Sequence, residues 1–204
     1  MQAVRFLASP HFNARPHTPI DLIVLHAISL PDGEFTTEHI TNFFLGNIDE
    51  AAHPSFKDLS KVRVSAHFVV ARDGSITQFV PTNQRAWHAG KSTWQGKGDC
   101  NNYSIGIEII GDERQPFTRK QYTETARLCR SLIAQYSAID KQRIVGHQDI
   151  APTRKWDPGK AMGLVSFPPL FSPHQTHAYK YSVITLGHTK TTLSFKEKRQ
   201  FVTF

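Results

Sequence analysis

Three ionisable residues lie in or at the end of segments that are otherwise apolar: His26, Glu108 and His147. An unpaired carboxylate is costly to bury, so a buried strand that carries one is expected to use it. Ten residues after His147 comes Asp157, which the following Pro-Gly pair would hold in a tight loop. Ligands and catalytic groups gather at the carboxyl ends of strands in open α/β sheets, so we expect these four side chains to meet.

Two imidazoles and one carboxylate form a three-ligand set for zinc, with the fourth position open as in catalytic sites. The sequence predicts one zinc ion per chain, bound by His26, His147 and Asp157. Zinc would lower the pKa of a water at the open position to about 7 and polarise a carbonyl. Glu108 could take the water's proton and pass it to a leaving nitrogen. Lys155, two residues before Asp157, could stabilise an oxyanion. The metal ligands, Glu108 and Lys155 together predict a site that hydrolyses an amide.

Residue types alone leave other interpretations open. The chain has 11 histidines, so pairs of histidines with an aspartate are easy to find in it. A hydrogen-bonded structural role competes for each strand-end histidine. An ion pair with a Lys or Arg competes for Glu108.

The elements that would position these residues are strands and helices in alternation. Strands are predicted at 21–26 and 104–110, the first with four consecutive large apolar residues that indicate burial on both faces. In the second, isoleucines share one face, while Gly106 and Glu108 share the other. A third, short strand is predicted at 143–147. An Asp-Gly turn inside 64–80 predicts a hairpin.

Helices are predicted at 36–45 and 118–136 from their apolar stripes and caps. Cys129 falls on the stripe of the second helix, so we expect it in the core. The stretch 81–103 has no clean period and is predicted to be a binding loop. Strands, helices and a hairpin together predict an α/β fold, a single domain whose mixed central β-sheet is flanked by helices.

A change in composition divides the chain into a domain at 1–160 and a basic, irregular C-terminal tail at 161–204. The net charge is +7, but residues 1–159 carry 18 Lys+Arg against 16 Asp+Glu. The prolines at 168, 169 and 173 exclude regular helix there. The basic excess thus rests on the tail, and we expect no nucleic-acid partner.

Other features of the sequence concern its compartment. No apolar stretch approaches the roughly 18 residues of a membrane helix, and the N-terminus lacks a signal peptide's apolar region. The two cysteines cannot form a disulfide framework, which fits a reducing compartment. We expect a cytoplasmic monomer with no membrane partner.

At the candidate site the sequence resembles the zinc-dependent N-acetylmuramoyl-L-alanine amidases, most closely the AmpD type, which are cytoplasmic 1,6-anhydro-N-acetylmuramyl-L-alanine amidases. The matching segments span about residues 10–160 in family order. They are Val24-Leu25-His26-Ala27-Ile28-Ser29-Leu30-Pro31, Arg63-Val64-Ser65-Ala66-His67, Arg85-Ala86-Trp87-His88-Ala89-Gly90, Tyr103-Ser104-Ile105-Gly106-Ile107-Glu108, Gly146-His147-Gln148-Asp149-Ile150-Ala151-Pro152 and Arg154-Lys155-Trp156-Asp157-Pro158-Gly159. The resemblance implies the same zinc ligands and catalytic pair, and the fold shared with peptidoglycan-recognition proteins.

The resemblance also implies the substrate, a small muropeptide cleaved between anhydro-muramic acid and L-alanine in cell-wall recycling. Trp87 would face the sugar, with a core role as the competing interpretation. Arg63 and Arg154 could pair with stem-peptide carboxylates, because a guanidinium matches a carboxylate fork. Surface solvation competes for both arginines. His88 would line the substrate cleft or cap its loop.

Two departures from the family pattern qualify this expectation. Ala27 stands where the family usually has Asn after the first zinc histidine, and the segment 160–164 replaces a Phe-Asp-Trp-like segment. Two alternatives remain: a general cell-wall or phage-type amidase, and a non-catalytic muropeptide-binding module. Binding modules of this kind typically lack a zinc ligand, whereas the full set is present here. Asp157 as third ligand, where several cell-wall enzymes use Cys, favours the recycling type.

Overall fold

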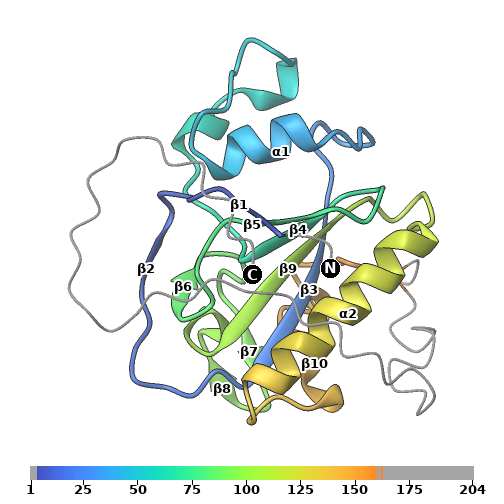
Figure 1. The fold of residues 1–204 in the computed structure, drawn as a ribbon. Coiled ribbons are helices and arrows are strands. Elements are labelled where there is room, and N and C mark those ends of the chain that lie inside the picture. The colour runs from blue at the N-terminus through green and yellow to red at the C-terminus, as the bar shows by residue number, and fades with distance from the viewer. Residues whose placement is uncertain (1–3, 160–161, 163–204) are drawn as a thin grey trace.

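Two seven-residue parallel strands, β3 (Leu22–Ile28) and β9 (Ser104–Ile110), form the middle of the main sheet in the computed structural model (Figure 1). The structure describes residues 4–159 and 162 of the 204-residue chain. All of β9 and the first five residues of β3 are buried. Their near-continuous apolar sequence is typical of strands that are covered on both faces.

Four shorter strands complete this sheet, whose order is β1-β5-β4-β9-β3-β10. They are β1 (Arg5–Phe6), β4 (Phe68–Val70), β5 (Ile76–Gln78) and β10 (Ile144–Gly146). β4 and β10 run parallel to their central neighbours, whereas β4 and β5 form an antiparallel hairpin. The hairpin turns at the predicted Asp-Gly pair, where Gly74 has a φ of +86°. The prediction of a mixed sheet is confirmed.

Helix α2 (Arg119–Gln135) covers one face of the sheet (Figure 1). It begins with a capping box, in which the Thr118 side chain and backbone N–H exchange hydrogen bonds with Gln121. Its buried stripe, which includes Leu128 and Leu132, packs in one core with Ile105, Ile107 and Ile109 of β9. Cys129 is part of this stripe, and burial raises the pKa of its thiol to about 12. The prediction that Cys129 belongs to the core is confirmed.

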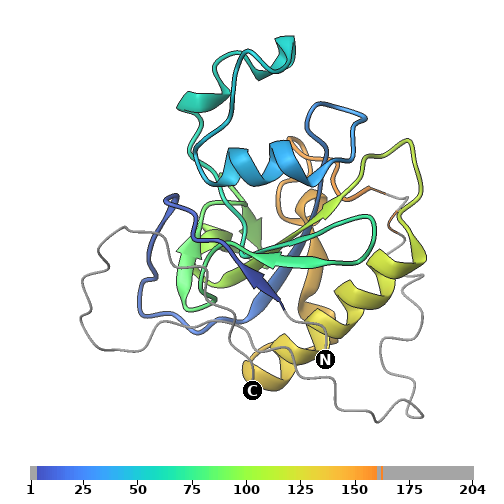
Figure 2. The same ribbon diagram turned by 45° about the horizontal axis from the view of Figure 1, so that its top comes forward.

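Helix α1 (Thr37–Phe44) belongs to a second core on the other side of the sheet (Figure 2). Its Ile40 and Phe44 pack with Val69 of β4, whose neighbours on either side face the first core. The helix stops before Gly46, which has a φ of +73°, as predicted. Helices on both faces position the central strands and cover the apolar residues.

Short elements fill the connections. They are β2 (Phe12–Ala14), β6 (Gln84–Ala86), β7 (Thr93–Trp94), β8 (Lys97–Gly98), α3 (His147–Ile150) and the 3₁₀ turns Pro54–Phe56, Leu59–Lys61, Cys100–Asn102 and Lys141–Arg143. β2 pairs with β6 and β7 with β8, each antiparallel. The predicted loop at 81–103 therefore contains three short strands. Strands of two or three residues are too short to produce a sequence period.

The tail predicted at 161–204 lies outside the described residues apart from Met162, which is buried in the core beneath α2. Of the helices in the described ranges, none combines the length and apolar composition that a bilayer crossing requires.

Candidate metal centre and catalytic groups

The register of the two central strands places His26 directly beside Glu108. Side chains alternate along a strand, and the isoleucines at 105, 107 and 109 face α2. Gly106 and Glu108 therefore face the opposite side of the sheet, where His26 lies as well. Both His26 and Glu108 are buried.

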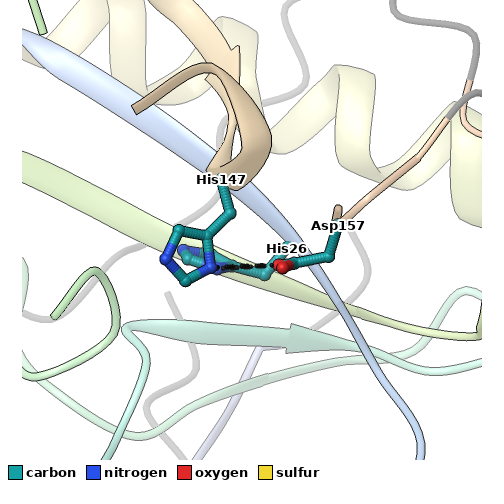
Figure 3. A group of neighbouring side chains, drawn as sticks. All are labelled: His26, His147 and Asp157. Atoms are coloured by element: carbon teal, nitrogen blue, oxygen red, sulfur yellow. Dashed lines mark hydrogen bonds and ion pairs between the residues drawn. The ribbon is translucent and has the colours of Figure 1, made fainter. Parts of the chain in front are cut away.

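His147 and Asp157 reach the same place from β10 and the loop that follows it. β10 runs parallel to β3 and ends at Gly146, so that His147 is the first residue of α3. A Cβ on Gly146 would lie 2.9 Å from Cδ of Pro158, so the glycine allows the Asp157 loop to approach closely. The backbone N–H of Gln148 donates to the carbonyl of Asp157 at 2.8 Å. Figure 3 shows the His26, His147 and Asp157 side chains pointing toward one another.

Two details differ from the sequence predictions. β3 continues past His26 to Ile28, and His147 begins a helix instead of ending a strand. The reason for the first is that pairing with β9 extends to Ile110. His26 therefore lies inside a strand whose pairing with β9 continues on both sides of it.

Three ligand atoms form a nearly equilateral triangle. Nδ1 of His26 lies 3.0 Å from Nδ1 of His147 and 3.3 Å from Oδ2 of Asp157. The third side, from Nδ1 of His147 to Oδ2 of Asp157, is 3.2 Å. A tetrahedral zinc with bonds of about 2.0–2.1 Å separates its ligands by about 3.3 Å. The donor types and their spacing therefore fit a metal ion, with a coordination position left over.

The protonation states of these groups also suit a metal. Burial lowers the pKa of His26 to about 4, so its imidazole is neutral at neutral pH. Burial alone would raise the pKa of Asp157, but the adjacent imidazoles of His147 and His26 outweigh it and hold the pKa below its ordinary value. Nε2 of His147 lies 3.1 Å from the carbonyl of Ala89, which can only accept. Its proton is therefore on Nε2, and the lone pair of Nδ1 faces the other ligands.

Glu108 adjoins the triangle without belonging to it. Its Oε1 is 4.0 Å from Nδ1 of His26, and its Oε2 is buried without a hydrogen-bond partner in the described structure. Burial and then the charge of Asp157 raise the pKa of Glu108 well above its ordinary value, while Lys155 lowers it. The charge of the half-buried Lys155 thus acts on Glu108. A carboxyl with a free oxygen beside a metal position can transfer a proton.

Two of the predicted substrate-binding residues share a groove of about 630 Å³. Arg63 and Trp87 line it together with His11, which stacks on the indole at a centroid distance of 6.3 Å. The indole Nε1–H of Trp87 donates to Oδ1 of Asn13 at 2.7 Å. Arg63 is exposed, and its Nη1 donates to the carbonyl of Ser60. The zinc-ligand candidates do not line this groove.

The other two predicted substrate-binding residues are engaged within the protein. Nη2 of Arg154 donates to the carbonyls of Ala89 and Lys91, each at 2.8 Å. Both ring nitrogens of His88 have partners, His26 and Ser104. The carbonyl of Ala89, which faces both His147 and Arg154, could not be predicted from the sequence, because a backbone acceptor has no residue signature. The close contact of the His88 ring with Gly106 did have a sequence signal, because a glycine inside a buried strand indicates that another group approaches the backbone closely.

Comparisons with known proteins show which family the chain resembles. Residues 16–160 match the family described as N-acetylmuramoyl-L-alanine amidase. The 1,6-anhydro-N-acetylmuramyl-L-alanine amidase AmpD of Escherichia coli is 47% identical over 174 residues, 84% of this chain and 94% of the relative. A crystal structure of a selenomethionine AmpD derivative superimposes with a TM-score of 0.80 at 43% identity, covering 84% of this chain and 96% of that chain.

A more distant solved structure contains a ligand. It is a complex of the E. coli amidase AmiD with anhydro-N-acetylmuramic acid-L-Ala-D-γ-Glu-L-Lys. It is 29% identical with a TM-score of 0.53, covering 76% of this chain and 58% of that chain.

Proposed function

Because the chain belongs to the N-acetylmuramoyl-L-alanine amidase family, we propose that it hydrolyses the amide between 1,6-anhydro-N-acetylmuramic acid and L-alanine of muropeptides. The observation that carries the proposal is the convergence of His26, His147 and Asp157 beside Glu108. The relatives with this anhydro-sugar specificity in their names match over most of their length. The corresponding process is peptidoglycan recycling.

The proposed metal is zinc, one ion per chain, held by His26, His147 and Asp157. Two imidazoles and a carboxylate are ligands that zinc accepts, and three protein ligands are typical of catalytic zinc. When bound, zinc supplies Lewis-acid chemistry, which acidifies water and polarises a carbonyl.

The catalytic groups of the chain would move one proton and stabilise one charge. Glu108 would accept a proton from the attacking water and deliver it to the alanine nitrogen, so that the amine leaves as the C–N bond breaks. The ammonium of Lys155 would stabilise the negative charge that develops on the carbonyl oxygen. The products are the free lactyl carboxylate and the stem peptide.

The proposed substrate contacts are Trp87 for the sugar and Arg63 and Arg154 for stem-peptide carboxylates. The open groove that Trp87 and Arg63 line supports the first two assignments. Arg154 donates to two loop carbonyls through one nitrogen, so any carboxylate contact would use the rest of its guanidinium. The ligand of the AmiD complex supports a small muropeptide as the class of substrate.

Further proposals concern organisation and compartment. We place the amidase domain at 1–160 and a largely dispensable tail at 161–204, which is supported by a family match that ends at residue 160. Deletion of 166–204 is expected to leave a folded, metal-binding enzyme, and an unfolded or metal-free product would refute this. We propose a cytoplasmic monomer without membrane or nucleic-acid partners.

A mass-spectrometric competition assay tests the function. The zinc-loaded protein receives equal amounts of anhydro-muramyl tripeptide and the matching non-anhydro muropeptide. Peptide release mainly from the anhydro substrate supports the proposal. Equal cleavage of both would indicate a general cell-wall amidase, and cleavage of neither would indicate a binding module.

A further inference from the structure

The side chain of His88 contacts a metal-ligand candidate on the nitrogen that faces away from the metal position. Its Nδ1 lies 2.9 Å from Nε2 of His26. On the other side of the ring, Nε2 lies 3.4 Å from Oγ of Ser104, whose hydroxyl donates to the carbonyl of Cys100 at 2.6 Å. The four groups form one continuous chain of hydrogen bonds in the protein interior.

The end of this chain determines the direction of every hydrogen bond in it. The carbonyl of Cys100 can only accept, so the hydroxyl hydrogen of Ser104 is already used. Ser104 Oγ must therefore accept from Nε2 of His88, which leaves Nδ1 of His88 unprotonated. Nε2 of His26 then donates to it, and Nδ1 of His26 has its lone pair directed at the metal position. This series of hydrogen bonds therefore selects the tautomer of His26 that can bind a metal.

The backbone around His88 is shaped to hold the ring in this position. A Cβ on Gly106 would lie 2.4 Å from Cγ of His88 and 2.6 Å from its Cδ2 and Nδ1. The imidazole thus occupies the space that a side chain on β9 would fill. Oδ1 of Asn101 accepts from the backbone N–H groups of His88 and Ala89, at 3.1 and 2.8 Å.

The same short segment orients the second histidine ligand. The carbonyl of Ala89, one residue after His88, accepts from Nε2 of His147 at 3.1 Å. Groups that orient a ligand histidine through its second nitrogen raise metal affinity, and their loss typically weakens it 10–100-fold.

We propose that His88 is a positioning residue of the metal centre, not a substrate contact: it fixes the tautomer and ring orientation of His26. The inference rests on the proposed zinc-binding function.

Zinc affinity, measured by competition with a chelator in the absence of substrate, tests this role. His88→Leu removes the acceptor, and its zinc Kd is expected to rise about 10–100-fold. His88→Asn keeps an acceptor oxygen near the place of Nδ1 and is expected to remain within about threefold of the wild type. His11→Leu is the matched control, because it removes a buried imidazole whose ring, among the described residues, hydrogen-bonds to the carbonyl of Val64 and to no zinc-ligand candidate. A folded His88→Leu variant with wild-type zinc affinity would overturn the proposal.

Gly106→Ala provides an independent perturbation that changes no polar group. Its Cβ would displace the His88 ring, so zinc affinity is expected to fall in the same direction as in His88→Leu. In a His88→Ala background the ring is gone, and the added effect of Gly106→Ala should be small. Fully additive effects would mean that the glycine acts elsewhere, and would count against the proposal.

A measurement on the wild type covers the case in which the variants do not fold. In ¹⁵N NMR spectra of the zinc-loaded protein, His26 and His88 should both be protonated at Nε2 only. A proton on Nδ1 of His88 would overturn the inference. Neither readout uses substrate, so absence of amidase activity in a zinc-binding wild type would refute the proposed function and leave the role of His88 standing.

Discussion

Replacing Glu108 by Gln tests the proposed division of labour between metal ligands and proton transfer. The substitution keeps the shape of the side chain and removes its ability to exchange a proton. General acid–base catalysis contributes about 10²–10⁴-fold, so turnover is expected to fall by that factor. At about 1.36 kcal/mol per factor of ten, this corresponds to a barrier increase of about 3–5 kcal/mol.

Zinc content should not change in this variant. Oε1 of Glu108 lies 4.0 Å from Nδ1 of His26, outside the triangle of ligand atoms that are 3.0 to 3.3 Å apart. Metal analysis of the purified variant is the direct assay. A variant without zinc would show that Glu108 is a ligand, and one retaining more than about a tenth of wild-type turnover would show that it transfers no proton in the limiting step.

The same variant should stabilise the metal-free protein at neutral pH. Since burial raises the pKa of Glu108, the native state retains a proton that the unfolded chain releases at about pH 4.3. Between the two pKa values, native stability falls as pH rises, and glutamine removes this loss. Each unit by which the native pKa exceeds the unfolded one, counted up to pH 7, corresponds to about 1.4 kcal/mol of expected gain. Urea unfolding at about pH 4 and pH 7 measures it; a difference that does not grow with pH would contradict the reasoning.

Other variants test separate parts of the site and fold. Asp157→Ala is expected to lose zinc, because it removes one side of the ligand triangle, and full occupancy by metal analysis would exclude Asp157 as a ligand. Trp87→Ala should raise KM for the anhydro substrate about tenfold with kcat nearly unchanged, as expected for a contact made equally in ground and transition states; a selective fall in kcat would contradict this. Gly111→Ala would place a Cβ 2.4 Å from Cε1 of Phe117 and should destabilise the protein by about 1–3 kcal/mol in urea unfolding, with unchanged zinc content. Wild-type stability would show that Phe117 can move aside.

The sequence by itself determined the elements that have a strong pattern. The isoleucine alternation of β9 predicted its bounds, and the apolar stripe and Thr118 cap predicted α2 to within a residue at either end. The chemical types of His26, His147 and Asp157 indicated a three-ligand metal site before any distance was known. These features are local, because alternation, capping and ligand chemistry depend on residues that are near in sequence or on side-chain type alone.

Only the tertiary structure decided how these residues meet. The pairing register of β3 and β9 brings His26 beside Glu108, 82 positions apart, and no local pattern encodes a register. The contact of His88 with His26 depends on the space that Gly106 leaves free, and the partner of His147 is a backbone carbonyl that any residue could supply. Orientation of the ligands is therefore a property of packing between distant segments, whereas the choice of ligands is a property of the sequence.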